Sequence, residues 1–367
     1  MSAVLCVDVG STFTKAVLVD DSDGTLLSTA SHPTTLATDV LDGVRAVREA
    51  AERQALAPGA RASDVLACSS AGGGLRIGVV GYERQVTAEA GYRVALSAGG
   101  RVVHVHAGPL DGTGIAALRA ARPDVLLLAG GTDGGNAEVL LHNAHRIATA
   151  RIAAPIVLAG NAEAADEART ALERTGRRVT VAANVLPRIG VLDPLGARTA
   201  IREVFLRHVI GGKGLSRGPQ FRRLIRAATP DVVLAGVEVL ADGAPDRGVP
   251  GAGDVLVVDV GGATTDVYSV VTPLGEDAVL RRDVVATLWR ARTVEGDLGM
   301  RWNAPGVVEA AFAERLLDPP DQEHLRALAA RLAADPGRLP AADDAVGVAD
   351  DVRLARFAVT VAARRHG

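Results

Sequence analysis

The chain has 367 residues, a length that allows roughly two or three domains with well-formed cores. Hydrophobic residues make up 48% of it, but no uninterrupted apolar run reaches the roughly 18 residues that a membrane span needs, so we expect a cytoplasmic protein. A net charge of −3, with both signs interspersed, favours neither nucleic acid nor an anionic membrane as a partner. The two cysteines lie in apolar runs, which predicts small buried side chains rather than a disulfide framework.

The first 80 residues have the pattern of several strands and one helix. Apolar residues at Val40, Val44, Val47 and Ala51 predict a helix with one buried face. In chain order, the predicted elements are strands at residues 4–7, 16–19 and 25–30, a helix at 39–55, a strand at 65–69 and, after a glycine turn, an apolar run up to residue 80. This order differs from the start of a dinucleotide-binding fold, in which the first strand leads directly into a helix.

Strand and helix patterns alternate from residue 83 to residue 243. Short apolar runs such as VLLLAGG and IVLAGN precede segments with helical periodicity, and a helical stretch over about 194–241 ends the region. Such alternation is typical of parallel strands connected by helices, so we expect an inserted α/β domain here. A Gly- and Pro-rich linker, GAPDRGVPGAGD, follows it.

The segment after the linker, VLVVDVGGATTDVYSVV, repeats the opening stretch VLCVDVGSTFTKAVLVD. Both contain an apolar strand, an aspartate, small residues, hydroxyls and a second apolar strand, so that Asp8 and Asp259 occupy the same position. A further strand is predicted at residues 279–288, and the remainder is mostly helical. We therefore predict an α/β fold in which two similar halves face each other across a cleft. The predicted domains are residues 1–82, 83–243 and 254–367.

The turn of the first hairpin has the residues of a phosphate-binding loop. Consecutive backbone N–H groups and hydroxyls that converge at a tight turn form a nest for an anion. Lys15 can place a cation on the β- and γ-phosphates of a nucleotide, and Asp8 can hold Mg²⁺ through its water shell, because Mg²⁺ keeps most of its waters. The other residues predicted to contact phosphate are Gly10, Ser11, Thr12 and Thr14.

The second hairpin can grip the same phosphates from the opposite side. Asp259 is the second predicted aspartate for Mg²⁺, through water, and Thr264 joins Lys15 in stabilising charge on the phosphate. Asp266 is predicted to orient the turn. The phosphate-binding residues predicted in this copy are Gly261, Gly262, Thr265 and Asp266. One such hairpin is usually only a turn, but two copies with aligned aspartates predict a clamp for phosphate groups with Mg²⁺.

Other polar segments leave alternatives open. TVEGDLG offers Glu295 and Asp297, which can position the attacking water or contact Mg²⁺, or can form an ordinary acidic loop. AGGTDGGN, at residues 129–136, can bind an anion at a helix N-terminus or serve as a glycine-rich crossover turn. The histidine pairs at 104 and 106 and at 142 and 145 lack the remaining ligands of a closed transition-metal site. No pattern identifies a catalytic base.

Five segments of the chain carry a resemblance to known proteins. DVGSTFTK and DVGGATTD resemble the two phosphate motifs of the actin-like (RNase H-like) ATPase superfamily. More narrowly, LLLAGGTDGGNAEVLLHNA, VAANVLPRIGVLDPLGARTAIREVF and RTVEGDLGMRW closely resemble the GlmL or MutL family associated with glutamate mutase, which is unrelated to the mismatch-repair protein of the same name. The resemblance extends along nearly the whole chain.

The resemblance implies two actin-like ATPase halves and an ATP-dependent reactivating chaperone with a slow ATPase. Its implied partner is an adenosylcobalamin-dependent mutase of the glutamate or methylaspartate type, from which it releases damaged cobalamin. Actin-like proteins normally close the second half with further strands and a glycine-rich loop that contacts adenosine. Since the sequence stops at AARRHG, in or just after a helix, we expect a second half that is truncated at its C-terminus.

Two other functions fit the same motifs. A small-molecule kinase of the superfamily would need an acceptor-hydroxyl site with a general base in the cleft, which the sequence does not identify. A non-catalytic scaffold of that fold would keep the two halves without turnover.

Overall fold

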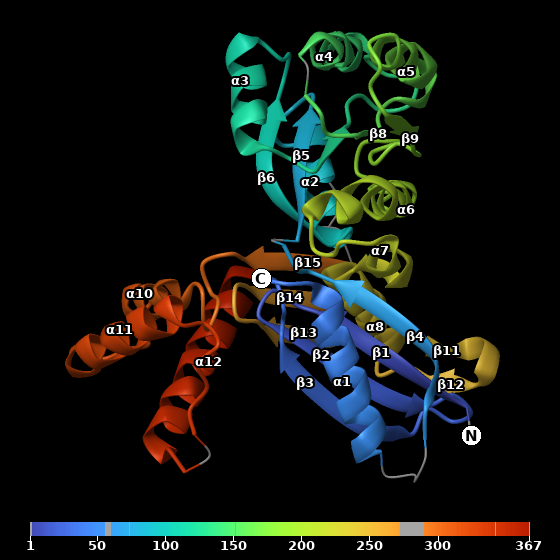
Figure 1. Cartoon of the computed structure of the whole chain (residues 1–367). Helices are drawn as coiled ribbons and strands as arrows, with labels where there is room; N and C mark the ends of the chain where they lie inside the picture. Colours follow the sequence, from blue (N-terminus) through green and yellow to red (C-terminus); the bar gives the residue numbers. More distant parts are fainter. Residues whose placement is uncertain are drawn as a thin grey trace.

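The computed structural model describes residues 2–55, 60–72, 74–150, 152–271, 290–341 and 343–366, and these residues have the mixed α/β architecture that the sequence predicts. Their strands form two five-stranded sheets, one three-stranded sheet and one two-stranded sheet. Figure 1 shows one five-stranded sheet with its helices standing above the other sheets, which form the base of the molecule. The strand predicted at residues 279–288 lies outside the described residues.

The first sheet has the strand order β10-β4-β1-β2-β3. β1, β2 and β3 are antiparallel neighbours, whereas β4 runs parallel to β1 and β10 runs parallel to β4. The bounds are β1 Ala3–Val9, β2 Phe13–Asp20, β3 Leu26–Pro33, β4 Ala62–Ser69 and β10 Ile225–Ala228. α1 (Val40–Gln54) packs on this sheet through the apolar face that the sequence predicts.

The second five-stranded sheet is parallel throughout, with the order β6-β5-β7-β8-β9. Its strands are β5 Leu75–Gly81, β6 Gly100–Ala107, β7 Val125–Leu128, β8 Ile156–Leu158 and β9 Val179–Val181. Its helices are α2 Thr87–Ser97, α3 Gly112–Ala121, α4 Glu138–Thr149, the 3₁₀ turn η1 Ala162–Ala164, α5 Ala165–Glu173 and α6 Leu195–Val204. We call this sheet and its helices the parallel-sheet unit.

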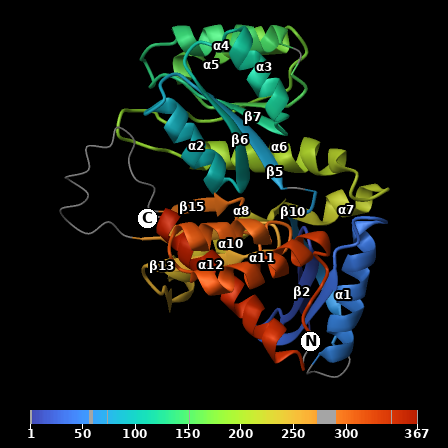
Figure 2. The same cartoon turned by 90° about the vertical axis from the view of Figure 1, so that its left-hand side faces the viewer.

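Helices cover both faces of the parallel-sheet unit. Side chains of β5, β7 and β8 that point to one face pack with α2 and α6, and those that point to the other face pack with α3, α4 and α5. Figure 2 shows these two helical layers on either side of the strands. Strands covered on both faces are apolar at nearly every position, which explains runs such as VLLL in β7.

The chain enters the parallel-sheet unit before its predicted start and leaves it before its predicted end. β5 pairs with β6 and β7 rather than with the first sheet, so the chain crosses between the sheets after β4, before the predicted boundary at residues 82–83. β10 then returns to the first sheet, before the predicted end at residue 243. The intervening elements are η2 Phe205–Val209, which is a π-helical turn, η3 Ile210–Lys213 and α7 Pro219–Leu224.

The third sheet consists of β13, β14 and β15 in antiparallel order. α8 packs against one of its faces through Leu234, Val237 and Ala241, and α10, α11 and α12 pack together beside Val267 of β14. The bounds are α8 Thr229–Asp242, β11 Gly243–Ala244, η4 Pro245–Arg247, β12 Val249–Pro250, β13 Val255–Val260, β14 Thr265–Val270, β15 Arg290–Glu295, α10 Ala304–Ala313, α11 Pro319–Ala334 and α12 Ala345–His366.

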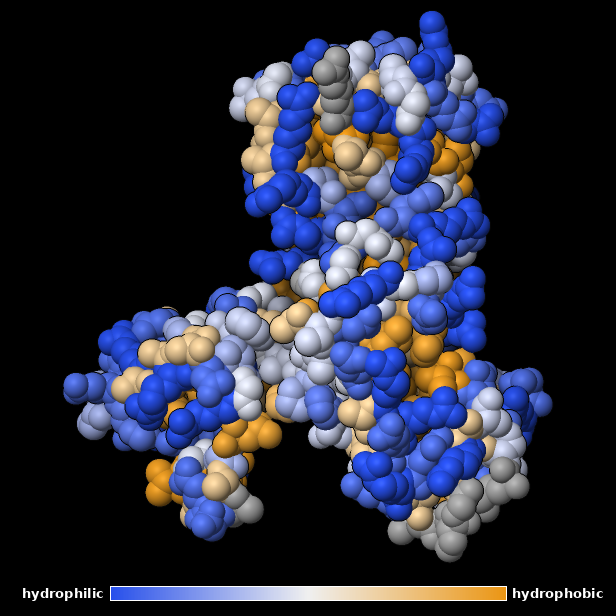
Figure 3. Space-filling model, viewed as in Figure 1, coloured by the Kyte–Doolittle hydropathy of each residue, from blue (hydrophilic) through white to orange (hydrophobic). Residues whose placement is uncertain are grey.

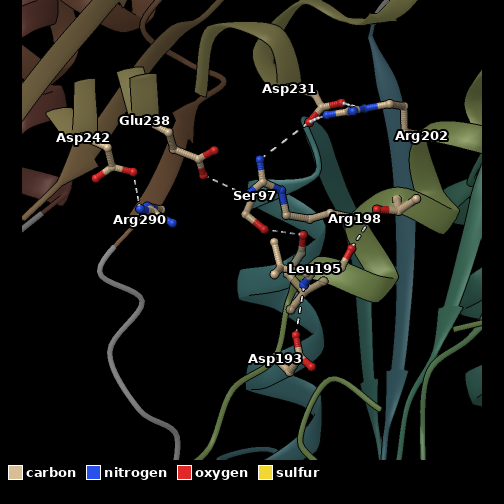
Figure 4. Close-up of polar contacts among 11 residues, drawn as sticks. Ser97, Asp193, Leu195, Arg198, Arg202, Asp231, Glu238, Asp242 and Arg290 are labelled. Atoms are coloured by element: carbon tan, nitrogen blue, oxygen red, sulfur yellow. Dashed lines mark hydrogen bonds and ion pairs between the residues drawn. The ribbon is translucent and has the colours of Figure 1, made fainter. Parts of the chain in front are cut away.

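An ion-pair cluster joins α6 of the parallel-sheet unit to α8. Asp231, in the first turn of α8, is 2% exposed and accepts hydrogen bonds from Arg202 Nε at 2.6 Å and Nη2 at 2.9 Å. Arg198 Nη1 donates to Glu238 at 2.9 Å. Glu238 lies about two helical turns after Asp231 in α8. Figure 4 shows Arg198 lying between the two acidic side chains. Because breaking a buried ion pair leaves an uncompensated charge, these contacts fix α8 against α6.

Polar side chains cover most of the face seen in Figure 3, and apolar surface is visible along the arm that α12 forms. Val346, Val348 and Val352 of this helix are exposed. Among the described residues, no helix is both long and apolar enough to cross a membrane.

Candidate functional site

The two hairpins that the sequence predicts as repeats have the same geometry. In the β1–β2 hairpin Asp8 pairs with Lys15, and in the β13–β14 hairpin Asp259 pairs with Asp266. Each turn is closed by the N–H of its first glycine, from Gly10 to Phe13 O at 3.1 Å and from Gly261 to Thr264 O at 2.9 Å. The predicted internal repeat is therefore confirmed as a structural repeat.

The first glycine of each turn has no room for a side chain. A Cβ at Gly10 would lie 2.7 Å from Phe13 O, and a Cβ at Gly261 would lie 2.9 Å from Thr264 O. Both distances are shorter than Cβ atoms tolerate, so the tight turn requires glycine at both positions.

Both turns line one cavity of about 340 Å³, a volume typical of small-molecule sites. They also touch each other, since a Cβ at Gly262 would lie 2.5 Å from Thr12 Oγ1. The predicted site residues that line the cavity are Asp8, Gly10, Ser11, Thr12, Lys15, Asp259, Gly261, Gly262, Thr264 and Asp266. The structure thus brings most of the predicted residues from both repeats together.

The backbone N–H groups of the two turns remain available to a ligand. Those of Ser11, Thr12, Gly262 and Ala263 donate to no acceptor within the described residues. The carbonyls of the second turn are occupied, because the N–H groups of residues 300–302 donate to Gly261 O and Gly262 O at 2.8–3.0 Å. Free N–H groups beside satisfied carbonyls are the arrangement expected of an anion-binding nest.

Thr14 and Thr265, at equivalent positions of the two repeats, do not line the cavity. Both are fully buried, and their hydroxyls make structural hydrogen bonds, Thr14 with Thr34 Oγ1 at 3.2 Å and Thr265 with Leu298 O at 2.5 Å. Their side chains are therefore not placed for the predicted contact with phosphate, and the reason is physical. Successive residues of a strand point to opposite faces, so Thr14 faces the core when Lys15 faces the cavity.

Asp8 is held by a residue that the sequence did not identify. Thr229, the first residue of α8, donates its hydroxyl to Asp8 Oδ1 at 2.6 Å, and Lys15 Nζ lies 4.0 Å from Asp8 Oδ2. The neighbouring Cys68 thiol also contacts Asp8, and burial together with this carboxylate raises the pKa of Cys68 to about 12. Cys68 is therefore a neutral thiol at physiological pH, but it is half-buried rather than fully buried as predicted.

Asp259 accepts no hydrogen bond or ion pair from the described residues. Burial raises the pKa of its carboxyl, and the nearby carboxylates of Asp266 and Asp8 raise it further, while Lys15 opposes them. An acidic side chain in this environment favours a proton or a cation beside it.

Asp266 joins the second hairpin to the parallel-sheet unit. Its Oδ1 accepts from Arg292 Nε at 3.0 Å, and its Oδ2 accepts from Thr264 Oγ1 at 3.1 Å, which fits the predicted role in orienting the turn. Arg292 is 5% exposed, and its Nη1 also donates to the backbone carbonyls of Leu96 and Gly100 at 3.1 and 3.0 Å. One buried guanidinium therefore holds the second turn and the start of β6 together.

Glu295 and Asp297 are not among the residues that line the cavity. Arg365 of α12 bonds both carboxylates, at 2.8 Å to Glu295 and 3.0 Å to Asp297. Their position does not support the predicted role in placing a water, and the alternative of a structural acidic loop fits the contacts better.

The remaining polar segments have structural contacts. In the loop at residues 129–136, Asn184 Nδ2 donates to Gly131 O at 3.0 Å and Asn161 Nδ2 donates to Gly135 O at 3.0 Å, as expected of a crossover turn. Lys213, the second lysine of the chain, pairs with Asp124 at 2.9 Å. Within the described ranges, no group of three His, Cys, Asp or Glu side chains is placed to hold a metal ion on its own.

Several polar residues of the cavity escaped the sequence analysis. They are Ser70, Arg101, Thr229, Arg292, Arg301 and Asn303. Thr229 precedes a proline at a helix start, a signal that marks the helix but not its neighbour Asp8. The arginines carry no local signal, because they reach the cavity only through the tertiary fold.

The sequence is similar to known proteins along most of its length. The sequence model of the family described as "MutL protein" matches residues 4–367. Protein MutL of Clostridium tetanomorphum is 38% identical over 318 residues, which cover 86% of this chain and 68% of that protein. The nucleotide-free structure of acetone carboxylase, whose title concerns ATP-dependent acetone carboxylation, aligns with a TM-score of 0.31 and 14% identity over 80% of this chain and 48% of that chain. This last score does not establish a shared fold, whereas the first two findings show that the chain belongs to the MutL protein family.

Proposed function

We propose that the chain binds Mg²⁺–ATP between its two hairpin turns and hydrolyses it slowly. The observation that carries the proposal is the position of Asp8 and Asp259, at the same place in two structural repeats that line one cavity. The available N–H groups of both turns would cradle the phosphates. Lys15 and Thr264 would contact the phosphate oxygens, and positioning with charge stabilisation is what phosphoryl transfer needs most.

The residues of the cavity suit a magnesium ion. Asp259 lacks a hydrogen-bond donor in the described part of the chain, and burial disfavours its ionised form, so a divalent cation would satisfy it. Asp8 lies close enough to influence the pKa of Asp259. A site with two carboxylates and few other protein ligands fits Mg²⁺, because this ion keeps several waters and is also coordinated by phosphate oxygens of the substrate. When bound, Mg²⁺ supplies positive charge to the phosphate groups.

Two actin-like halves with an inserted domain are the architecture that we propose for this site. The order β10-β4-β1-β2-β3 surrounds the first hairpin, and β13, β14 and β15 repeat the antiparallel arrangement of β1, β2 and β3 around the second. The parallel-sheet unit would then be the insertion. ATP would hold the halves together through both turns, and hydrolysis would remove the γ-phosphate contacts and let the cavity relax.

The function proposed for this motion is the reactivation of an adenosylcobalamin-dependent mutase of the glutamate type. Membership of the MutL family supports it. In this proposal the parallel-sheet unit carries the surface for the mutase subunits, because it is far larger than a connection needs to be. By linkage, the mutase must then change the affinity for ATP by the same factor by which ATP changes the affinity for the mutase.

The test is hydrolysis of Mg²⁺–ATP with and without purified mutase subunits, and retention of those subunits with ATP, with ADP and without nucleotide. Stimulated hydrolysis and state-dependent retention are expected. Asp8→Ala and Asp259→Ala should abolish hydrolysis, whereas Asp21→Ala, which removes an exposed carboxylate just after β2, should not. Wild-type turnover in the first two variants would contradict the two-turn site. Failure to retain any subunit in all three states would favour the kinase or the scaffold.

A further inference from the structure

Four cationic side chains line the cavity within the described residues, and three of them are already committed. Lys15, Arg292 and Arg301 each lie beside an aspartate, at 4.0 Å for Lys15 and 2.6 Å for Arg301, and Arg292 is buried against its partner. The fourth, Arg101, is exposed, and its guanidinium makes no ion pair or hydrogen bond with any described residue. Its guanidinium is therefore available to a ligand in the cavity.

Arg101 reaches the cavity from a part of the fold that neither hairpin belongs to. It is the second residue of β6, in the parallel-sheet unit. Its guanidinium lies along Gly296, just after β15, where a Cβ would be 3.5 Å from Nη2 and 3.6 Å from Cζ. The side chain thus extends from the parallel-sheet unit to the wall of the cavity formed by the third sheet.

The backbone just before Arg101 is held by two contacts. Gly100 O accepts from Arg292 Nη1, the same guanidinium that holds the second turn through Asp266. Gly99 has a φ of +78°, and a Cβ there would lie 2.8 Å from the N atom of Asp231, the acidic residue at the centre of the cluster in Figure 4. These contacts place Arg101 in a defined position beside the second turn and α8.

We infer that Arg101 donates hydrogen bonds to the terminal phosphate of the nucleotide, so that the parallel-sheet unit distinguishes ATP from ADP. The inference rests on the proposed nucleotide site. The terminal phosphate carries the most negative charge of ATP, and three aspartates in the cavity repel that phosphate. The guanidinium of Arg101 faces the same space without an acidic partner, so it stabilises the terminal phosphate. A guanidinium matches phosphate geometry through two parallel N–H groups and stays protonated at any physiological pH. Arg101 makes no covalent bond and transfers no proton.

Removal of this contact should affect ATP and ADP differently. Arg101→Ala is expected to lower the ratio of ATP affinity to ADP affinity about tenfold or more, as for a hydrogen bond to a charged group. Hydrolysis should slow by about a hundredfold or more, because the negative charge that develops on the phosphate in the transition state no longer has the hydrogen-bond donor of Arg101 beside it. Arg101→Lys keeps the charge without the planar pair of donors and should give an intermediate loss.

The experiment is calorimetric titration of the whole chain with Mg²⁺–ATP and with Mg²⁺–ADP, with circular dichroism to check folding. Arg247→Ala, which removes an exposed arginine of η4 that does not line the cavity, is the matched control and should bind like the wild type. An unchanged ATP to ADP ratio in folded Arg101→Ala overturns the inference, whatever its hydrolysis rate, while leaving the nucleotide site intact. A wild-type chain that binds neither nucleotide overturns the proposed function, and the inference with it.

Discussion

The indole Nε1 of Trp302 donates a hydrogen bond to Thr12 Oγ1 across 3.3 Å. Thr12 lies in the turn of the first hairpin, and Trp302 follows the second hairpin by way of β15, so the contact joins the two walls of the cavity. The N–H of Trp302 also donates to Gly262 O at 2.9 Å. Trp302 therefore forms a hydrogen bond with each of the two turns.

The first prediction uses Trp302 as a reporter. Nucleotide binding should change its fluorescence, because Thr12 must adjust when its turn receives phosphate. Trp289→Phe leaves Trp302 as the single tryptophan, and titration of that variant with Mg²⁺–ATP is the measurement. Thr12→Ala in the same background is the control and should reduce the change. Calorimetry run in parallel establishes the nucleotide concentration at which the site is saturated. An emission spectrum that stays constant at that concentration would contradict the prediction.

The second prediction concerns the close approach of Gly262 and Thr12. Gly262→Ala places a Cβ 2.5 Å from Thr12 Oγ1 and should push the turns apart. Overpacking of this kind costs about 1–3 kcal/mol, so nucleotide affinity should fall by about tenfold or more. Adding Thr12→Ala removes the closest atom and should restore part of the affinity.

Gly236→Ala serves as the matched control for this pair. Gly236 lies within α8 with no atom near its Cβ position, so alanine there should raise helix stability by up to about 1 kcal/mol and leave binding unchanged. Equal affinities of Gly262→Ala and the wild type would show that the turns separate without cost.

The third prediction separates stability from function at Asp259. Burial raises the pKa of this carboxyl, so the folded protein holds the proton more tightly than the unfolded chain does. Stability is therefore lost as pH rises from the unfolded pKa, about 3.9, through the raised folded pKa. Asp259→Asn should unfold at a higher temperature than the wild type at pH 7 without Mg²⁺, and should match it near pH 4, while hydrolysing no ATP. A less stable variant at pH 7 would contradict this.

The fourth prediction concerns His366 at the end of α12. Its ring nitrogens bond Thr293 at 2.9 Å and Ser269 at 2.8 Å, and burial lowers its pKa, with Glu295 opposing the shift. The unfolded chain therefore takes up the proton first, and stability falls as pH drops below about 6.5. In denaturant unfolding, the free energy of unfolding of His366→Gln should fall less between pH 7 and pH 5 than that of the wild type. His145→Gln, on an exposed face of α4, should keep the wild-type slope.

The hairpins were predictable because their spacing is local. Asp8 and Asp259 each sit at the end of an apolar strand and before a short turn, so residue order alone fixes which groups meet. The same local geometry could have excluded Thr14 and Thr265, since alternation along a strand lets only one of two neighbours face the cavity. The face of α1 follows equally from its helical period.

Contacts between distant segments were not predictable in this way. The apolar run of β5 fits either sheet, and only the fold shows that it joins the parallel one. Arg365 reaches Glu295 from 70 residues away, and Thr229 reaches Asp8 from 221 residues away. A single sequence does not predict which of these residues meet. Arginine and glutamate are common on protein surfaces, and threonine is common at helix starts, so their presence does not indicate a partner.

The first turn of α8 combines three of the contacts described above. Thr229 donates to Asp8, Pro230 lines the cavity and Asp231 accepts from Arg202 of the parallel-sheet unit. Consecutive residues of one helical turn move as a rigid body. A substitution of Asp231 that displaces this turn would therefore also displace Thr229 from Asp8, although the two side chains contact different neighbours. A designer who wished to replace the parallel-sheet unit and keep these hairpins would have to redesign the contacts of this turn as well.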